Sequence, residues 1–333
     1  MIKAVLLFIV GLILLIKGGD WFVDGATGIA ERFHVPELLI GATVVSIGTT
    51  LPEVMVSANS ALSGHGEIAY GNALGSIICN SALIAAITVA IKPGRVDKKT
   101  LRVPVAFFFA AMLIYAFGAY VRGSFERPLG LVLLCVFVVY MIILIRQALS
   151  GMKTGDSASN NNEADDNNSE SKEKPLYKDI ILLVIGAVFI AEGADLLVDN
   201  GTIIAQAMGV PEAVIALTFV ALGTSLPELV TAITSLAKGH GALSLGNVCG
   251  ANLFNLVLVS GLSVTLSPFG LPNGKMINIG GSPVNASLVV DLPVSILVMV
   301  VLTIPALIKG ELKRWQGILL LATYGGFCIF QFM

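Results

Sequence analysis

Long apolar stretches separated by short polar turns run along almost the whole chain of 333 residues. A helix that crosses the hydrocarbon core of a bilayer needs about 20 predominantly apolar residues, and more when it is tilted. The pattern therefore predicts an all-α membrane protein with ten transmembrane helices in two sets of five. The predicted helices cover residues 2–30, 35–62, 67–91, 101–121 and 128–149, then 177–206, 211–237, 242–266, 284–308 and 312–332.

The two sets are separated by a polar segment, residues 151–176, which is rich in Asn, Ser, Asp and Glu. It has no apolar periodicity and cannot bury enough surface to fold alone, so we expect a flexible linker. Its acidic residues do not follow the spacing of a calcium-binding loop. The domains are then residues 1–150, the linker 151–176, and residues 177–333.

Composition agrees with the membrane interpretation. The chain is 56% hydrophobic and only 13% charged, whereas soluble proteins average about 25% charged residues. Its net charge of −2 does not suggest nucleic acid as a partner. The cysteines are far apart in apolar stretches and predict neither a zinc site nor a disulfide framework; they are Cys79, Cys135, Cys249 and Cys328.

An internal repeat relates the two sets of helices. Residues 18–83 align without a gap to residues 193–258, at a constant offset of 175. Because each set holds an odd number of helices, the second copy must enter the membrane from the opposite side. This arrangement is the inverted-topology repeat of many secondary transporters.

Basic residues are unevenly distributed over the predicted loops. They concentrate in residues 92–102, 146–178 and 309–314, which the inverted arrangement places on one side of the membrane. Loops rich in Lys and Arg usually face the cytoplasm. We therefore expect a multi-pass protein of the cell membrane, with a cytoplasmic linker and both termini outside.

The repeat contains a polar motif inside two apolar helices: "GTTLPE" at residues 48–53 and "GTSLPE" at residues 223–228. Proline removes a backbone donor and clashes with the preceding turn. With the nearby glycine, it predicts a break in each helix that frees the carbonyls of residues 46–50 and 221–225. Such backbone is tolerated in a bilayer where it lines a cavity or binds a ligand.

The same motif supplies carboxylates and hydroxyls. These hard oxygen ligands suit Ca²⁺ or Na⁺ rather than a soft metal. Apart from Lys17 nearer a helix end, no Lys or Arg lies in the neighbouring core segments, and intramembrane carboxylates are functional by default. Two facing glutamates carry about two negative charges, so one divalent ion, several monovalent ions or protons would compete for one site. The motif residues are Thr49, Thr50 and Glu53, with Thr224, Ser225 and Glu228 in the second copy.

A second repeated motif reads "GNALGSIICN" at residues 71–80 and "GNVCGANLFN" at residues 246–255. Glycines four residues apart let helices approach closely. Ser76 and Asn80 are also four apart and share one helix face. Asn255 is the repeat counterpart of Asn80. We expect these side chains to point oxygens at the same centre as Glu53.

Together the two motifs resemble those of the sodium/calcium exchanger family, within the cation/calcium exchanger superfamily, over nearly the whole chain. The resemblance implies exchange of typically three Na⁺ for one Ca²⁺, with the first and sixth helices sliding to alternate access. It implies that Glu53 and Glu228 bind Ca²⁺. Backbone oxygens would come from Thr49, Thr224, Ser46 and Ala221, and side-chain oxygens from Thr50, Ser225, Ser76, Asn80 and Asn255.

Some positions depart from the family pattern. Ala251 stands where the family often has Ser, and it offers no side-chain oxygen to sodium. Asn255 stands where potassium-dependent members have Asp, so it points away from potassium cotransport. The acid that the proton/calcium branch carries in the second motif is absent.

These features predict an antiporter that expels Ca²⁺ using inward Na⁺ flow, with no organic cofactor. The alternative is a proton-coupled or broader divalent-cation exchanger. A channel would place its filter on an axis between subunits, whereas here both halves of the site lie in one chain, so a monomer suffices. An enzyme would need a nucleophile or metal triad, which the sequence does not offer. The implied partners are Ca²⁺, Na⁺ and the lipid bilayer.

Overall fold

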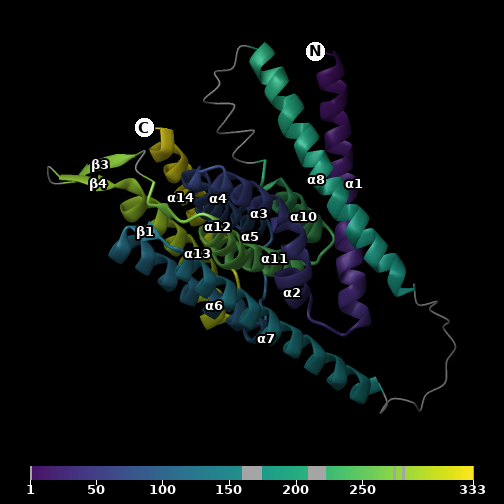
Figure 1. Cartoon of the computed structure of the whole chain (residues 1–333). Helices are drawn as coiled ribbons and strands as arrows, with labels where there is room; N and C mark the ends of the chain where they lie inside the picture. The colour runs from purple at the N-terminus through teal and green to yellow at the C-terminus, as the bar shows by residue number, and fades with distance from the viewer. Residues whose placement is uncertain (1, 160–174, 209–222, 273–274, 280–281, 333) are drawn as a thin grey trace.

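A computed structural model describes residues 2–159, 175–208, 223–272, 275–279 and 282–332 of the chain. Helices dominate this part of the molecule (Figure 1). Eight of them are long and apolar enough to cross a membrane. The predicted all-α, multi-pass membrane fold is therefore confirmed, while the count of ten membrane helices stays a prediction.

Helical segments of the first half follow the predicted spans closely. In chain order they are α1 (Ile2–Arg32), α2 (Glu37–Ile40), the π-helical η1 (Gly41–Val45), α3 (Ser46–Leu62), α4 (Gly66–Cys79), the π-helical η2 (Asn80–Ala85), α5 (Ala86–Ile91), α6 (Lys98–Phe117), the π-helical η3 (Gly118–Arg122) and α7 (Arg127–Ser159). The α7 helix continues beyond residue 150, where the sequence predicts the linker to begin. Residues 160–174 lie outside the described residues.

The second half begins with α8 (Leu176–Ala207). Of the predicted helix 211–237, only the part from residue 223 onward is described, so Ala221 lies outside the described residues. The elements that follow are α10 (Leu226–Ala237), α11 (Gly241–Phe254), the π-helical η5 (Asn255–Ser260), α12 (Gly261–Leu266), the π-helical η6 (Ser287–Asp291), α13 (Leu292–Lys309) and α14 (Arg314–Phe332).

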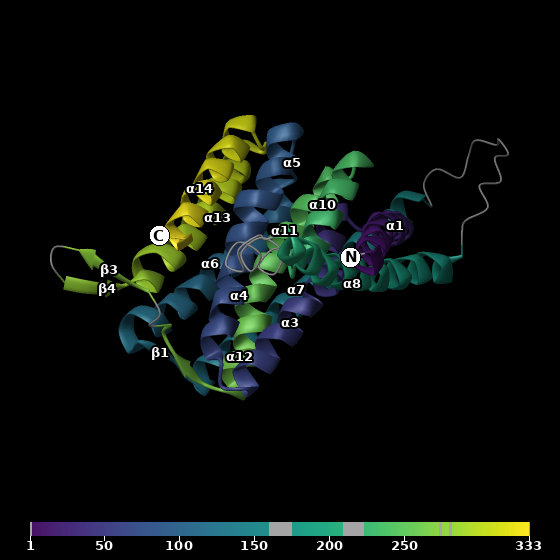
Figure 2. The same ribbon diagram turned by 90° about the horizontal axis from the view of Figure 1, so that it is seen from above.

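Short strands connect some of the helices. Strand β1 (Ser124–Phe125) pairs antiparallel with β2 (Phe269–Gly270) and thereby joins a loop of the first half to one of the second. Strands β3 (Met276–Ile279) and β4 (Ser282–Asn285) form an antiparallel hairpin at the edge of the molecule (Figure 2). Neither pair contributes to the predicted ion site.

The α1 and α8 helices lie side by side and are inclined against the remaining bundle (Figure 1). They meet through glycines: a Cβ added to Gly11 would stand 2.9 Å from the carbonyl oxygen of Gly193. Much of this pair faces outward, because 28% of the apolar window of α1 and 22% of that of α8 are buried. For the span that contains α11 the share is 83%. The core of the fold therefore lies around α11, and α1 with α8 lies at its side.

Small residues allow α11 to contact the first half closely. A Cβ on Gly246 would approach the carbonyl oxygen of Leu38 to 2.2 Å, and one on Gly250 would approach Ser46 Oγ to 2.3 Å. The close packing predicted from the glycine spacing is thus confirmed for the second copy of the motif, but it is wrong for the first copy, where a Cβ on Gly71 or Gly75 would meet no atom of another described segment within 4 Å. Figure 2 shows α11 within the bundle, with α3, α4 and α10 nearby.

The predicted helix break is wrong for the first half. The α3 helix runs continuously from Ser46 to Leu62 with Pro52 inside it, directly after the π-helical η1. In the second half, Gly223–Ser225 form a turn and α10 begins at Leu226, with Pro227 in its first turn. Packing of η1 and α3 against α11 maintains the helix around Pro52, so tertiary contacts outweigh the local cost of proline.

Candidate functional site

Two glutamates lie at the centre of the site, Glu53 on α3 and Glu228 in the first turn of α10. Both are fully buried, and they are close enough for their charges to interact. None of their four carboxylate oxygens has a hydrogen-bond partner among the described residues. No ion pair reaches either glutamate in this part of the chain. Two such buried carboxylates are costly unless a cation or protons balance them.

Further polar atoms around the glutamates are buried without a partner in the described chain. They come from α3, from α10 and the residue before it, and from η2 and η5. These segments lie together: α3 contacts α10 and η5, and α10 contacts η2. Thr49 and Thr50 also lie within interaction range of the Glu228 carboxylate, although outside hydrogen-bonding geometry. The partnerless atoms include Thr50 Oγ1, Ser225 Oγ, and the amide oxygens and nitrogens of Asn80 and Asn255. All four residues belong to the predicted ligand set.

Asn80 and Asn255 share a backbone feature that the sequence did not reveal. Each is the first residue of a π-helical segment, η2 in the first half and η5 in the second. Single-turn π segments inside α-helices are frequent at functional sites, because the extra residue per turn re-aims side chains and disturbs the regular ladder. The internal repeat thus extends to the local backbone geometry at these asparagines.

The remaining predicted ligands have varied environments. Ser76 is buried on α4, one turn before Asn80. The hydroxyl of Ser46 is used in packing: its Oγ lies 2.7 Å from the carbonyl oxygen of Gly41 and 3.0 Å from that of Asn247. Ala251 is fully buried on α11.

Two site residues were missed when ligands were assigned from the sequence. Asn247 Oδ1 accepts hydrogen bonds from Thr49 Oγ1 at 3.2 Å and Ser46 Oγ at 3.3 Å. Asn72 Nδ2 donates to the carbonyl oxygen of Glu53 at 3.3 Å and to Ser57 Oγ at 2.8 Å. Their identity across the repeat was the available signal, since they are the Asn of both "GN" pairs.

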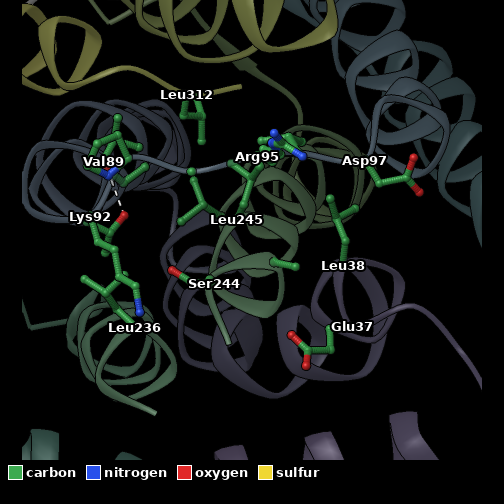
Figure 3. Close-up of a pocket in the computed structure, with 18 of the residues that line it drawn as sticks. Glu37, Leu38, Val89, Lys92, Arg95, Asp97, Leu236, Ser244, Leu245 and Leu312 are labelled. Atoms are coloured by element: carbon green, nitrogen blue, oxygen red, sulfur yellow. Dashed lines mark hydrogen bonds between the residues drawn. The ribbon is translucent and has the colours of Figure 1, made fainter. Parts of the chain in front are cut away.

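A cavity of about 500 Å³ lies between α3 and α8 and reaches the first threonine of each glutamate motif. Its lining includes Thr49 and Thr224, with Asp195 and Asp199 on the α8 side. A separate cavity of about 310 Å³ lies between the end of α5, the start of α2 and the loop 92–97 (Figure 3). None of the predicted ion ligands that the structure describes lines this second cavity, whereas Thr49 and Thr224 line the first.

Known proteins share both the sequence and the fold. The family described as "Sodium/calcium exchanger protein" matches residues 3–146 and 178–333. Sodium/calcium exchanger MaX1 of Methanosarcina acetivorans is 32% identical over 98% of each chain. Inner membrane protein YrbG of Escherichia coli is 34% identical over 80% of this chain and 81% of its own.

A solved structure of the sodium-calcium exchanger NCX_Mj, soaked with Na⁺ and Ca²⁺, superposes with a TM-score of 0.77. It is 30% identical and covers 97% of both chains. The family match spans both halves of the repeat, including both glutamate motifs and both asparagine motifs. This chain is therefore a member of the sodium/calcium exchanger family.

Proposed function

We propose that this protein expels Ca²⁺ from the cell in exchange for Na⁺ that flows inward, by alternating access to one central site. The observation that carries the proposal is the fully buried pair of Glu53 and Glu228, whose carboxylates have no hydrogen-bond or ion-pair partner in the described chain. One Ca²⁺ would balance the charge of this pair, and so would more than one Na⁺. Competition between them for the same oxygens is what couples the two fluxes.

The ligand roles follow from the chemistry of the donors. Glu53 and Glu228 would bind Ca²⁺, aided by the backbone oxygens of Thr49 and Thr224. Thr50 and Ser225 would offer hydroxyls to Na⁺, with carbonyls from residues 46 and 221. Side-chain oxygens of Ser76, Asn80 and Asn255 would complete the shell. Support comes from the partnerless buried oxygens of Thr50, Asn80, Ser225 and Asn255, since hard cations prefer such ligands.

Orientation in the membrane follows from the basic loops. By the positive-inside rule we infer that the linker 151–176 is cytoplasmic and that both termini are outside. The cavity between α3 and α8 would then be the path from the outside to the site. Sliding of α1 and α8 past the core would close this path and open one from the cytoplasm. Both copies of each motif lie in one chain, so a monomer is sufficient.

The test is uptake of ⁴⁵Ca²⁺ into proteoliposomes loaded with Na⁺, with the Na⁺, K⁺ and pH gradients varied separately. We expect uptake to follow the outward Na⁺ gradient and to be insensitive to K⁺. Uptake that a pH gradient alone can drive would replace the proposal with proton-coupled exchange. Uptake without any gradient dependence, at about 10⁶ ions per second or more, would indicate a channel.

A further inference from the structure

In an inverted-topology repeat, a path that opens to one side of the membrane has a counterpart that opens to the other side. The cavity between α3 and α8 has Asp195 and Asp199 on its α8 side. The repeat offset of 175 residues converts them into Asp20 and Asp24 of α1, and it converts α3 into α10. The counterpart of the cavity is therefore expected between α1 and α10.

At this counterpart position, α1 and α10 are packed closely together (Figure 2). A Cβ added to Gly19 of α1 would approach Val230 Cγ1 to 2.6 Å and Thr234 Oγ1 to 2.9 Å. Thr231 of α10 is fully buried, whereas its repeat counterpart Val56, which lines the cavity, is 40% exposed. The side between α1 and α10 is therefore closed in the conformation in which the side between α3 and α8 is open.

A lysine connects the two helices on the closed side. Lys238 lies in the turn after α10, and its Nζ is 2.7 Å from Asp24 Oδ1 and 3.5 Å from Asp20 Oδ1. The same ammonium group donates to the backbone carbonyl oxygen of Asp20 at 2.9 Å. All three acceptors belong to α1. Lys238 thus attaches the end of α10 to a helix that has to slide if access alternates as proposed.

The open side has no such ion pair among the described residues. The repeat counterpart of Lys238 is Ser63, whose side chain is short and uncharged. No basic side chain in the described part of the chain forms an ion pair with Asp195 or Asp199. The equivalent carboxylates are therefore paired with a lysine on the closed side and face the cavity on the open side.

We infer that Lys238 is a positioning residue that keeps the path between α1 and α10 closed by holding Asp20 and Asp24. When α1 slides, the lysine releases these carboxylates, which then line the second path as Asp195 and Asp199 line the first. The inference rests on the proposed function, because it assumes alternating access. An exposed ion pair adds little to stability, but one that exists in a single state shifts the equilibrium between two states.

Two reporter cysteines measure how open each path is in purified protein in nanodiscs. Met55→Cys reports on the cavity, which Met55 lines with a side chain that is 61% exposed. Val230→Cys reports on the closed side, where Val230 faces Gly19. Both are made in a background in which Cys135 and Cys328 are replaced by serine, while the two buried cysteines stay. A water-soluble maleimide should modify position 55 faster than position 230.

Loss of the lysine's charge should change the two rates in opposite directions. Lys238→Gln should speed modification at position 230 about fivefold, the shift in an equilibrium constant that one such ion pair can produce, and should slow it at position 55. Lys238→Arg keeps the charge and should behave as the wild type does. Asp24→Asn should reproduce part of the effect, and the double variant D24N/K238Q should equal K238Q alone, because both substitutions remove the same interaction.

Exchanging the repeat counterparts supplies the matched comparison. Ser63→Lys places an ammonium group in the turn after α3, where Asp195 and Asp199 are the equivalent acceptors. The double variant S63K/K238S should therefore favour the opposite state. We expect faster modification at position 230 and slower modification at position 55 than in K238S alone.

Parallel changes at both reporters would indicate a loosened fold and would overturn the inference, as would wild-type rates in both Lys238→Gln and Asp24→Asn. Lys238 is only 27% exposed, so the Asp24 variant keeps the test available if the lysine variants do not fold. The modification rates do not require transport. A wild-type protein without Na⁺-driven ⁴⁵Ca²⁺ uptake would refute the proposed exchange, while the reporter rates would still decide the role of Lys238.

Discussion

The two copies of the "GT[TS]LPE" motif have different backbone structures. In the first half the motif lies inside α3, and Pro52 stands in the middle of a continuous helix. In the second half Gly223–Ser225 form a turn, and Pro227 occupies the first turn of α10. Proline is well accommodated in a first turn, where no N–H is needed, and costs about 3 kcal/mol in a helix interior. The comparison teaches that the contacts around a motif decide its backbone conformation, while its side chains can still reach one common centre.

The residues that precede α10 and α6 at the N-cap position also differ in whether they cap their helix. Ser225 precedes α10 at the position of an N-cap, yet its hydroxyl makes no capping bond and has no partner among the described residues. At α6, by contrast, Asp97 caps the helix by accepting from the N–H of Lys99 at 3.0 Å. Because the Ser225 hydroxyl does not cap α10, its oxygen is available to bind a cation.

The largest effect should come from the glutamates, the point at which the two halves are most alike. Glu53→Gln and Glu228→Gln should each reduce Ca²⁺ exchange by about 100-fold or more, which exceeds the typical loss of a group that only orients a ligand. Each variant should remain folded, because glutamine removes a buried charge. Exchange assays and size-exclusion chromatography test both points. Activity retained by only one of the two variants would show that the halves are not equivalent at the ion.

Replacing each proline by alanine should change stability differently in the two halves, because Pro52 lies inside a helix and Pro227 lies in a first turn. In Pro52→Ala the new N–H can bond to the carbonyl of Gly48, so we expect a higher melting temperature, equivalent to about 1–3 kcal/mol. Pro227→Ala should change stability by less than about 0.5 kcal/mol, because a first-turn residue has no such bond to gain. Thermal unfolding followed by circular dichroism in detergent measures both. Equal shifts in the two variants would argue against the observed helix through Pro52.

The two helix starts can be compared by truncating each cap. Asp97→Ala should destabilise the protein by about 1 kcal/mol, as loss of an N-cap usually does. Ser225→Ala should cost less stability, because no capping bond is lost, but should weaken Na⁺ competition for Ca²⁺. A Ser225→Ala variant that loses as much stability as Asp97→Ala and retains Na⁺ competition would assign that hydroxyl to capping.

The Asp97 cap also predicts a pH dependence. The Thr100 hydroxyl, which donates to Asp97, lowers the pKa of this carboxyl below its usual value, and the N–H of Lys99 contributes. A lowered pKa stabilises the fold above the unfolded-state value of about 3.9, and this contribution is lost as the pH falls towards the native value. Melting temperatures of wild type and Asp97→Asn should therefore converge between about pH 5 and pH 3. A constant difference over this range would contradict the assigned cap.

The smallest effect on stability should come from replacing Lys238, which lies in the turn after α10. Lys238 forms ion pairs with Asp24 at 2.7 Å and Asp20 at 3.5 Å, and so connects the end of α10 to α1. Its repeat counterpart is Ser63. Lys238→Ser should cost less than about 1 kcal/mol, because these groups are partly exposed. The shift in melting temperature should shrink as salt is added, since salt screens exposed charges. A salt-independent loss would point to packing instead.

Hydropathy located most helices within a few residues. The predicted spans 67–91 and 242–266 correspond to the described helical stretches 66–91 and 241–266. The repeat identified six residues whose buried polar atoms lack partners among the described residues: Thr50, Glu53, Asn80, Ser225, Glu228 and Asn255. It did not identify Thr231 and Ser235, which lie on α10 with Glu228 and also have partnerless hydroxyls. The predicted helix break at Pro52 was wrong, because helix propensity reflects only the local chain and not the tertiary contacts around it. The hydrogen bonds of Asn72 and Asn247 went unrecognised, since a bond between residues about 150 or 200 positions apart leaves no local pattern.

The amino-acid sequence by itself determined the membrane fold, the internal repeat and the pair of carboxylates. Each of these depends on the apolar length of a segment or on residue identity at a constant offset, which can be read along the chain. Tertiary structure alone decided that Pro52 lies in a helix, that Asn80 and Asn255 begin π-helical segments, and that each motif threonine donates to the opposite repeat. These outcomes depend on which side chains meet when α3, α4, α10 and α11 pack together, because packing and buried hydrogen bonds outweigh the modest preferences of the isolated backbone.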